Sequence, residues 1–173
     1  MIREKYPVDA IVNNVGVVLP EALGEISLAS FYQVYDLNVR SAVQVVQAFS
    51  YSMKQRQEGR VINIASTASH GSAGKTSYSA AKSALVACTK TWALELADYG
   101  ITVNAISPGP VETQLLRENY PVGSEKEKQL LADIPLKRLA RPEEIAAAVQ
   151  FLLSHDAAFI TGQVLQIDGG KSL

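Results

Sequence analysis

Short runs of β-branched residues alternate with long amphipathic stretches along this chain of 173 residues. The short runs are rich in valine and isoleucine and stop at Asn, Ser, Pro or Gly, which is typical of strands buried on both faces. This alternation predicts an α/β fold, with a Rossmann-like parallel sheet and helices on both of its faces. We expect the four strands at Val8–Asn13, Arg60–Ser66, Ile101–Ser107 and Gln163–Asp168.

Three longer stretches have apolar residues at helical spacing, and they predict helices at about Leu28–Arg56, Ser77–Asp98 and Pro142–Ser154. The third begins at a proline followed by two glutamates, a strong start signal because carboxylates favour the positive end of a helix. The apolar stripe of the first helix consists of Phe31, Tyr35, Asn38, Ala42, Val45 and Phe49.

The segment Val111–Ala140 follows a predicted strand, and it differs from the rest of the chain. Its periodicity is weak, and it carries a run of charged residues. A long polar insertion after a strand is more often functional than structural. We interpret it as a mobile lid within one domain that spans residues 1–173.

The composition narrows the class of protein. Apolar residues make up 47% and charged residues 19% of the chain, which excludes a disordered protein. The net charge of −1 lacks the basic excess expected of a nucleic-acid-binding protein. The single cysteine cannot form an internal disulfide, and no apolar stretch is long enough for a membrane span. We therefore expect a cytoplasmic protein that binds neither nucleic acid nor a membrane.

The candidate chemistry lies where the predicted strands end, because ligands of open α/β sheets bind outside the carboxyl ends of the strands. Tyr78 and Lys82 are four residues apart and share one face of the second helix. A neighbouring ammonium lowers the pKa of a tyrosine, so the pair could act as general acid and base toward an alcohol or ketone oxygen. Such a pair also arises by chance, and by itself it is a weak signal.

Two further polar residues have alternative interpretations. Ser66 ends a strand before Tyr78, where its hydroxyl could hold a substrate oxygen or cap the following turn. Asn38 lies in the apolar stripe of the first helix, where a buried amide needs partners. Either the backbone satisfies this amide or the amide has a role in the site.

Together these residues resemble the classical short-chain dehydrogenase/reductase family, and within it the β-ketoacyl-carrier-protein reductase-like group. The whole chain is similar to the C-terminal two thirds of a typical member. Asn38, Ser66, Tyr78 and Lys82 fall where the family places its catalytic tetrad. Other segments that resemble family signatures are Asn13-Asn14-Val15-Gly16, Pro108-Gly109 with Val111 and Thr113, and Ile167-Asp168-Gly169-Gly170.

The resemblance implies an oxidoreductase that transfers hydride between NAD or NADP and a small secondary alcohol or ketone. Tyr78 would exchange a proton with the substrate oxygen, and Lys82 would lower the pKa of Tyr78 and bind the nicotinamide ribose. Ser66 would orient the carbonyl, and Asn38 would hold a water that links Lys82 to solvent. The residues implied to bind the cofactor are Asn13, Asn14, Gly16, Tyr78, Lys82, Pro108, Gly109, Val111 and Thr113.

The chain also departs from the family pattern. Ser66 and Tyr78 are one residue closer than is common, which a loop through Ser69-His70-Gly71 could absorb. No glycine-rich turn precedes the first predicted strand, because the first glycine is Gly16. The four strands would therefore be the last four of the family's sheet. The first third, with the pyrophosphate and adenine site and the residue that selects NAD or NADP, would be absent.

This departure leaves an enzyme and a non-catalytic remnant, which would act only through oligomeric association, as open hypotheses. A methyltransferase ranks last, because it too would need a glycine-rich turn. Val8–Val12 would be an unpaired apolar edge, so we expect an obligate oligomer or a marginally stable chain. The resemblance implies a homodimer or homotetramer through helices 28–56 and 77–98.

The remaining reactive side chains predict no further chemistry. Cys88 is expected to be a small core residue, and Trp92 a core or interface residue. His70 and His155 stand apart from any Cys, Asp or Glu with ligand spacing, so no metal site is predicted.

Overall fold

Four parallel strands form one sheet in the order β1-β2-β3-β4, so neighbours in the sheet are also consecutive along the chain. The computed structural model describes residues 7–173. The predicted α/β fold with a parallel sheet is confirmed, and every strand ends within two residues of its predicted bounds. The strands are β1 (Ala10–Asn13), β2 (Gly59–Ile64), β3 (Ile101–Pro108) and β4 (Val164–Ile167).

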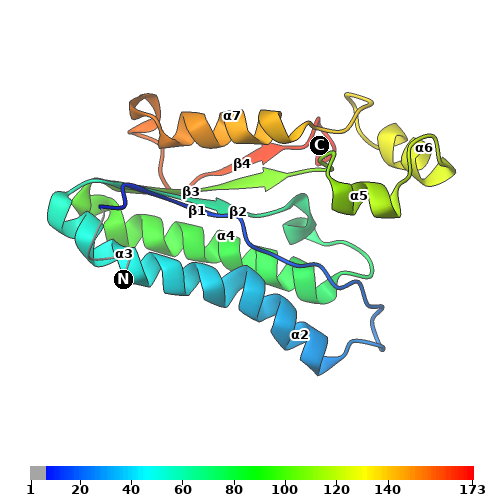
Figure 1. Cartoon of the computed structure of the whole chain (residues 1–173), viewed down its shortest axis with the longest axis horizontal. Coiled ribbons are helices and arrows are strands. Elements are labelled where there is room, and N and C mark those ends of the chain that lie inside the picture. Colours follow the sequence, from blue (N-terminus) through cyan, green and yellow to red (C-terminus); the bar gives the residue numbers. More distant parts are fainter. Residues whose placement is uncertain (1–6) are drawn as a thin grey trace.

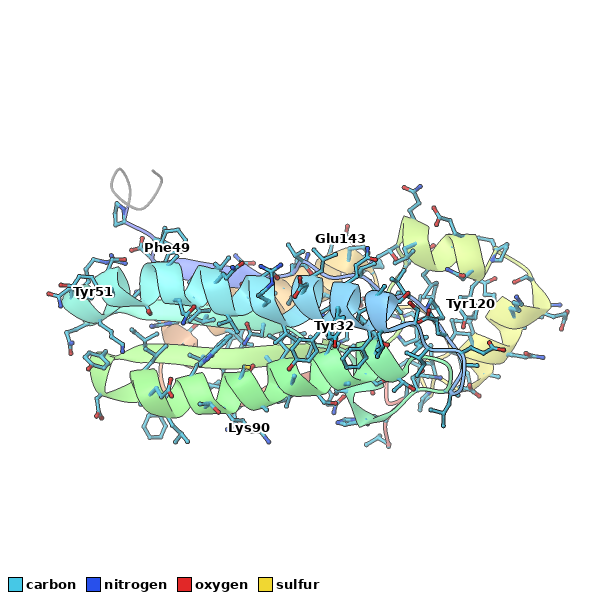
Figure 2. All side chains as sticks on the ribbon, turned by 90° about the horizontal axis from the view of Figure 1, so that it is seen from below. Tyr32, Phe49, Tyr51, Lys90, Tyr120 and Glu143 are labelled. Atoms are coloured by element: carbon cyan, nitrogen blue, oxygen red, sulfur yellow. The ribbon has the colours of Figure 1, made fainter. Side chains whose placement is uncertain are left out.

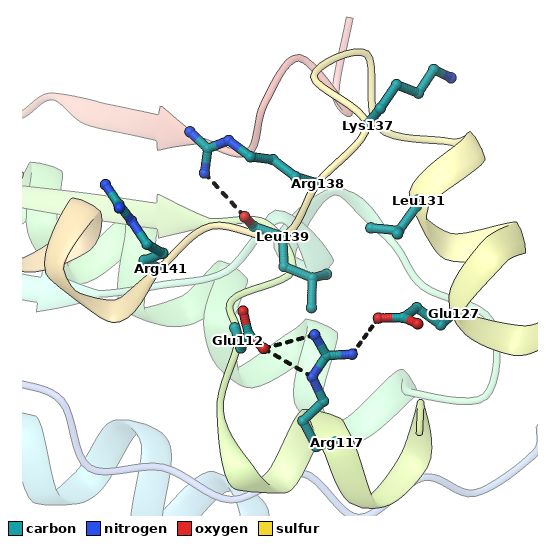
Figure 3. A pocket seen from close by; sticks show the side chains of 8 residues that line it. All are labelled: Glu112, Arg117, Glu127, Leu131, Lys137, Arg138, Leu139 and Arg141. Atoms are coloured by element: carbon teal, nitrogen blue, oxygen red, sulfur yellow. Dashed lines mark hydrogen bonds and ion pairs between the residues drawn. The ribbon is translucent and has the colours of Figure 1, made fainter. Parts of the chain in front are cut away.

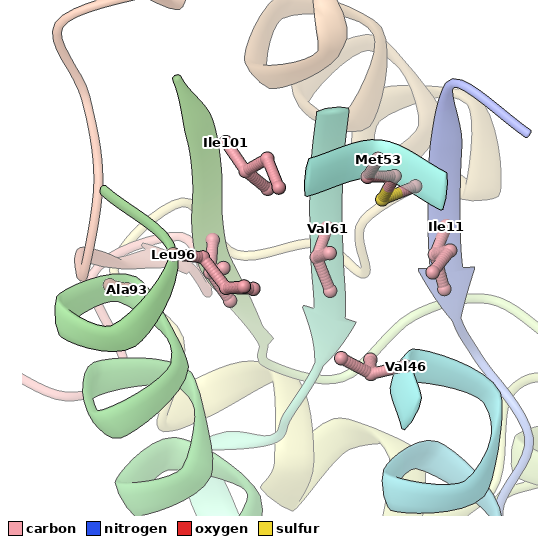
Figure 4. Close-up of a cluster of buried hydrophobic side chains, with 8 residues drawn as sticks. Ile11, Val46, Met53, Val61, Ala93, Leu96 and Ile101 are labelled. Carbon is pink, nitrogen blue, oxygen red and sulfur yellow. The ribbon is translucent and has the colours of Figure 1, made fainter. Parts of the chain in front are cut away.

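Helices cover both faces of this sheet (Figure 1). α3 (Ser41–Arg56) and α4 (Thr76–Leu96) lie on one face, and α7 (Pro142–Leu153) lies on the other. Successive residues of a strand point to opposite faces, which divides the core into two clusters. The cluster under α3 and α4 contains Ile11, Val46, Met53, Val61, Ala93, Leu96, Ile101 and Val103 (Figure 4). The cluster under α7 contains Ile62, Ile106, Leu152 and Ala157.

The first long helix spans Leu28–Arg56 as predicted, but a π-helical turn lies within it. It consists of α2 (Leu28–Tyr35), a π-helical turn η1 (Asp36–Arg40) and α3. A π turn holds more residues than an α turn, so the buried row advances in steps of four across it. The predicted stripe is therefore partly wrong: Tyr35 and Val45 are each 38% exposed, and the buried row is Val34, Asn38, Ala42 and Val46.

The other two predicted helices are present. α4 continues into the 3₁₀ turn η3 (Ala97–Tyr99), and α7 begins at Pro142. Trp92 is partly buried against the core under α3 and α4, whereas Cys88 is half-buried rather than a full core residue. No helix among residues 7–173 is long and apolar enough to cross a membrane.

The segment predicted as a lid follows β3, and its two ends lie side by side. An isolated parallel bridge pairs Val111 with Ala140, the two residues predicted to bound the lid. Between them lie two short helices, α5 (Gln114–Asn119) and α6 (Glu125–Ala132).

At the opposite edge of the sheet, β1 pairs only with β2 among the described residues, and Val12 is exposed there.

Candidate active site

Tyr78 and Lys82 point from α4 toward the carboxyl end of β2. Lys82 is only 4% exposed, and its Nζ donates a hydrogen bond to the carbonyl oxygen of Ile64 (2.7 Å), the last residue of β2. The same Nζ lies 5.6 Å from the ring centroid of Tyr78. The helical spacing therefore brings the phenol and the amine to one corner of the sheet, as predicted.

Asn38 reaches this corner from the π-helical turn η1. It is 1% exposed, and its Nδ2 donates to the carbonyl oxygens of Val17 and Val34, both at 2.8 Å. Its Oδ1 is buried and has no hydrogen-bond partner among the described residues. The backbone therefore satisfies only half of the amide. An acceptor oxygen is left that costs free energy unless a donor is supplied.

Gly16 makes room for this oxygen. A Cβ at that position would overlap Asn38 Oδ1 and lie 3.4 Å from Lys82 Nζ. Only a residue without a side chain allows the loop after β1 to pass this close to both polar groups. Gly16, Asn38 and Lys82 therefore form one contiguous group, although they come from three separate segments.

Ser66 caps the turn that follows β2, which was one of its two alternative interpretations. Its Oγ accepts a hydrogen bond from the N–H of Ala68 (3.1 Å) and thereby caps the 3₁₀ turn η2 (Thr67–His70). The same side chain also neighbours the Tyr78 phenol and favours its ionised form. We refer to Asn38, Ser66, Tyr78 and Lys82 as the polar corner.

Burial sets the protonation states of the polar corner. It raises the pKa of Tyr78, and the Ser66 side chain only partly opposes this rise. Burial also lowers the pKa of Lys82 to about 8. The Tyr78 pKa thus shifts upward, opposite to the lowering expected from Lys82, because burial of the phenol dominates and the Lys82 ammonium is bonded to the Ile64 carbonyl.

Asn13 is part of a buried chain of polar side chains rather than an open ligand group. Its Nδ2 donates to Asn63 Oδ1 (2.8 Å), Asn63 Nδ2 donates to Thr89 Oγ1 (2.8 Å), and Thr89 Oγ1 donates to the carbonyl of Leu85 (2.8 Å). The chain ties β1 and β2 to α4 beneath the polar corner. By contrast, Asn14 is exposed at the surface. The sequence analysis did not predict Asn63 and Thr89, although an Asn between two Ile residues in a buried strand indicates a buried polar contact.

The loop after β3 lies at the same end of the sheet. Gly109 packs against the turn after β4, where an added Cβ would come within 2.7 Å of Asp168 Cβ. Burial raises the pKa of Asp168, but hydrogen bonds from Ser172 and Gly170 outweigh it and lower the pKa overall. Pro108 ends β3 at the same position, and the Thr113 Oγ1 accepts the N–H of Leu116 (3.2 Å) to cap α5.

The backbone of Val111 faces away from the lid. Glu112 N–H donates to Ala140 O (2.8 Å), and Ala140 N–H donates to Pro110 O (3.0 Å). Because the residues on either side of Val111 make these bonds, the N–H and C=O of Val111 itself point to the opposite side. A donor and an acceptor are thereby presented side by side at the end of β3.

Comparison with known proteins decides the family. The family model described as enoyl-(acyl carrier protein) reductase matches residues 2–172. A solved structure described as a short chain dehydrogenase/reductase family protein superposes with a TM-score of 0.90 at 38% identity, covering 99% of this chain and 71% of that chain. The chain belongs to the short-chain dehydrogenase/reductase family.

Two curated short-chain dehydrogenase/reductase relatives are similar along nearly the whole chain. Nodulation protein G of Azospirillum brasilense is 41% identical over 169 residues, which is 95% of this chain and 66% of that protein. The 3-oxoacyl-(acyl-carrier-protein) reductase FabG of Thermotoga maritima is 38% identical over 173 residues, 98% of this chain and 68% of that protein. The chain thus spans about two thirds of the length of these relatives, and the predicted family is confirmed.

The nicotinamide half of a dinucleotide, the cofactor implied by membership of the short-chain dehydrogenase/reductase family, fits the residues present at this end of the sheet. The buried Asn38 Oδ1 lacks a donor, the Lys82 ammonium is a donor, and the Val111 N–H and C=O point away from Ala140. Gly16, which has no side chain, lies directly against the first two of these groups. No cluster of His, Cys, Asp or Glu suited to a metal ion occurs in the described part of the chain.

A separate cavity of about 470 Å³ lies in the lid, and no residue of the polar corner lines it (Figure 3). Its charged side chains form ion pairs that the sequence analysis did not predict. Short lid helices at the surface give no periodic signal from which such pairs could be predicted. The lining residues are Glu112, Arg117, Glu127, Leu131, Lys137, Arg138, Leu139 and Arg141.

Proposed function

We propose that this chain carries the catalytic part of an NAD(P)-dependent oxidoreductase that interconverts a secondary alcohol and a ketone. The observation that supports this most is the meeting of the polar corner at one end of the sheet, with a buried and unpartnered Asn38 Oδ1 beside Lys82. A purely structural amide would have both of its polar atoms satisfied. The Asn38 amide instead has a buried acceptor without a donor, next to Lys82.

Tyr78 is the proton donor and acceptor in this proposal. Its raised pKa keeps the phenol protonated near neutral pH, so it can give its proton to the oxygen of a ketone that is being reduced. The neighbouring Ser66 hydroxyl would orient that oxygen as a fixed dipole. The dinucleotide, when bound, supplies or accepts the hydride.

Lys82 and Asn38 would hold the cofactor and resupply the proton that Tyr78 gives to the substrate. With a pKa of about 8, Lys82 is mostly charged at neutral pH and can donate to a ribose hydroxyl. The free Asn38 Oδ1 is an acceptor for a water molecule that would connect Lys82 with solvent. In the same proposal, the backbone of Val111 would meet the nicotinamide carboxamide, and Gly16, Gly109 and Thr113 would allow the approach of the ring.

The first long helix (α2, η1 and α3) and α4 are the proposed oligomer interface. Figure 2 shows this side of the molecule from below, with Tyr32 on α2, Tyr51 on α3 and Lys90 on α4. Tyr32 and Tyr51 are 64% and 65% exposed, and Leu94 on α4 is 83% exposed. Exposed aromatic and aliphatic side chains on adjacent helices support a homodimer or homotetramer.

The proposal is tested by turnover of the full chain with NADH or NADPH and a panel of small ketones and 3-oxoacyl thioesters. Removal of the phenolic oxygen in Tyr78→Phe should lower the rate about 1,000-fold, because a positioned general acid contributes 10²- to 10⁴-fold. Tyr99→Phe, which removes a phenolic oxygen in η3 at the opposite end of the sheet, should leave the rate unchanged. Unchanged turnover in Tyr78→Phe would remove Tyr78 from its role. A chain that neither turns over nor binds dinucleotide would favour the non-catalytic remnant.

A further inference from the structure

Arg117 joins three parts of the lid through one guanidinium group. Its Nε and Nη2 donate to Glu112 Oε1 (3.2 and 2.8 Å), and its Nη1 donates to Glu127 Oε1 (Figure 3). The same Nη1 lies 3.5 Å from the carbonyl oxygen of Tyr120, to which it also donates. An arginine presents five N–H donors in a rigid fork, so one side chain can hold carboxylates from two different elements. Lysine could not reproduce this arrangement.

The Glu127 end of this network is buried and fully bonded. Glu127 is 8% exposed, its Oε2 accepts the N–H of Gly123 (2.6 Å), and its own N–H donates to Ser124 Oγ (3.2 Å). Arg117, followed by the Gly123 N–H, lowers the pKa of Glu127, so the carboxylate is ionised. A buried carboxylate requires a paired cation, which distinguishes this contact from an ordinary surface ion pair.

The Glu112 end lies next to the proposed nicotinamide side of the site. Glu112 directly follows Val111, and it precedes Thr113, which caps α5. The ion pair with Arg117 therefore anchors a residue that is directly bonded to Val111, whose N–H and C=O point away from Ala140. Through Arg117, the position of α6 is linked to this backbone.

We propose that Arg117 is a positioning residue that couples the lid helix α6 to the loop 111–113. The coupling makes the lid and this loop hold one arrangement at the edge of the site. Arg117 acts through Glu112 and the Val111 backbone, not on reacting atoms. The consequence for dinucleotide binding rests on the proposed function, whereas the coupling itself does not.

The test compares the wild-type full chain with Arg117→Met, a variant that keeps an aliphatic side chain and removes the guanidinium group. Amide hydrogen exchange in residues 112–132 should become about 10-fold faster, while the amides of β2, β3 and α4 stay within about 2-fold of wild type. The KM for the dinucleotide should rise about 5-fold with a smaller change in kcat, since binding geometry is lost and not the acid–base groups. Arg117→Lys, which keeps the charge without the fork, should fall between the two.

Two further variants sharpen the result. Glu127→Gln should reproduce the faster exchange in α6, whereas Lys128→Met, which removes an exposed ion pair with Glu125 on the same helix, should change nothing. Wild-type exchange in Arg117→Met overturns the proposed coupling, and so does an equal acceleration throughout the chain, because that shows a general loss of stability. Exchange is measured without dinucleotide. A wild-type chain that binds none therefore overturns the proposed function and not the coupling.

Discussion

The polar corner and the lid hold their polar side chains in opposite ways. At the corner, Asn38 and Lys82 are almost completely buried and bonded to backbone carbonyls of the sheet, a helix and a loop. In the lid, charged side chains pair with carboxylates, as Arg138 does at the surface with Glu144 of the neighbouring helix α7. The corner is therefore fixed by packing and desolvation, and the lid by charge. Mutation, pH and salt should affect the two regions differently.

The largest effect is expected beneath the polar corner, in the buried chain through Asn63. Asn63→Leu leaves the Asn13 Nδ2 without its acceptor and removes the donor to Thr89 Oγ1, which keeps its bond to the Leu85 carbonyl. The free energy of unfolding should fall by about 4 kcal/mol, since the loss of a bond to a buried group costs about 1–3 kcal/mol. Thr89→Val should cost less, because it removes one link. Denaturant unfolding of the single and double variants measures this, and costs that simply add would contradict a connected chain.

The pH dependence of stability should separate the two regions next. The pKa of Lys82 is about 8 in the folded protein and 10.5 in its ordinary state. Below pH 8 the Lys82 amine is protonated in both the folded and the unfolded protein. Between pH 8 and 10.5 it is protonated mainly in the unfolded protein, so the free energy of unfolding rises with pH. The free energy of unfolding of wild type, relative to Lys82→Met, should therefore increase by up to about 3 kcal/mol over this range. A difference that is flat across this range would place Lys82 in water.

Close packing around Gly16 should show as a smaller but clear effect. Gly16→Ala places a methyl group against Asn38 Oδ1 and Lys82 Nζ, and overpacking of this kind costs about 2 kcal/mol. Val15→Ala, one residue earlier at an exposed position, is the control and should change stability by less than about 0.5 kcal/mol. Thermal melting measures both. Equal midpoints would show that the loop moves aside without cost.

The smallest effect is expected in the lid. Arg138→Met removes the ion pair with Glu144, whose pKa is lowered to about 2 mainly by its hydrogen bond with Arg138. The variant should melt only slightly below wild type, and the difference should shrink in about 1 M salt, where the Debye length is about 3 Å. For the Asn63 and Gly16 variants the differences from wild type should persist in high salt. A salt-independent Arg138 effect would contradict an electrostatic lid.

The regions also differ in how far the sequence predicts them. The strands, the long helices and the spacing of Tyr78 and Lys82 depend on periodicity, which local residues encode. The π-helical turn was not predictable, because Asn38 bonds to the carbonyl of Val17, which is remote in sequence. The Tyr78 pKa was expected in the wrong direction, since spacing shows a nearby ammonium but not the depth of burial. The Arg117 network depends on the folded lid, and no local pattern indicates it.

Binding of NADH and NADPH to the full chain, followed by nicotinamide fluorescence, tests the central claim most directly. The proposed function predicts saturable binding of at least one dinucleotide. It also predicts affinity within about 2-fold of wild type for Tyr78→Phe and about 10-fold weaker for Lys82→Met, because only Lys82 is expected to bond to the ribose. Absence of binding at millimolar concentration of either dinucleotide, or wild-type affinity in Lys82→Met, would contradict the assignment of the polar corner as a nicotinamide site.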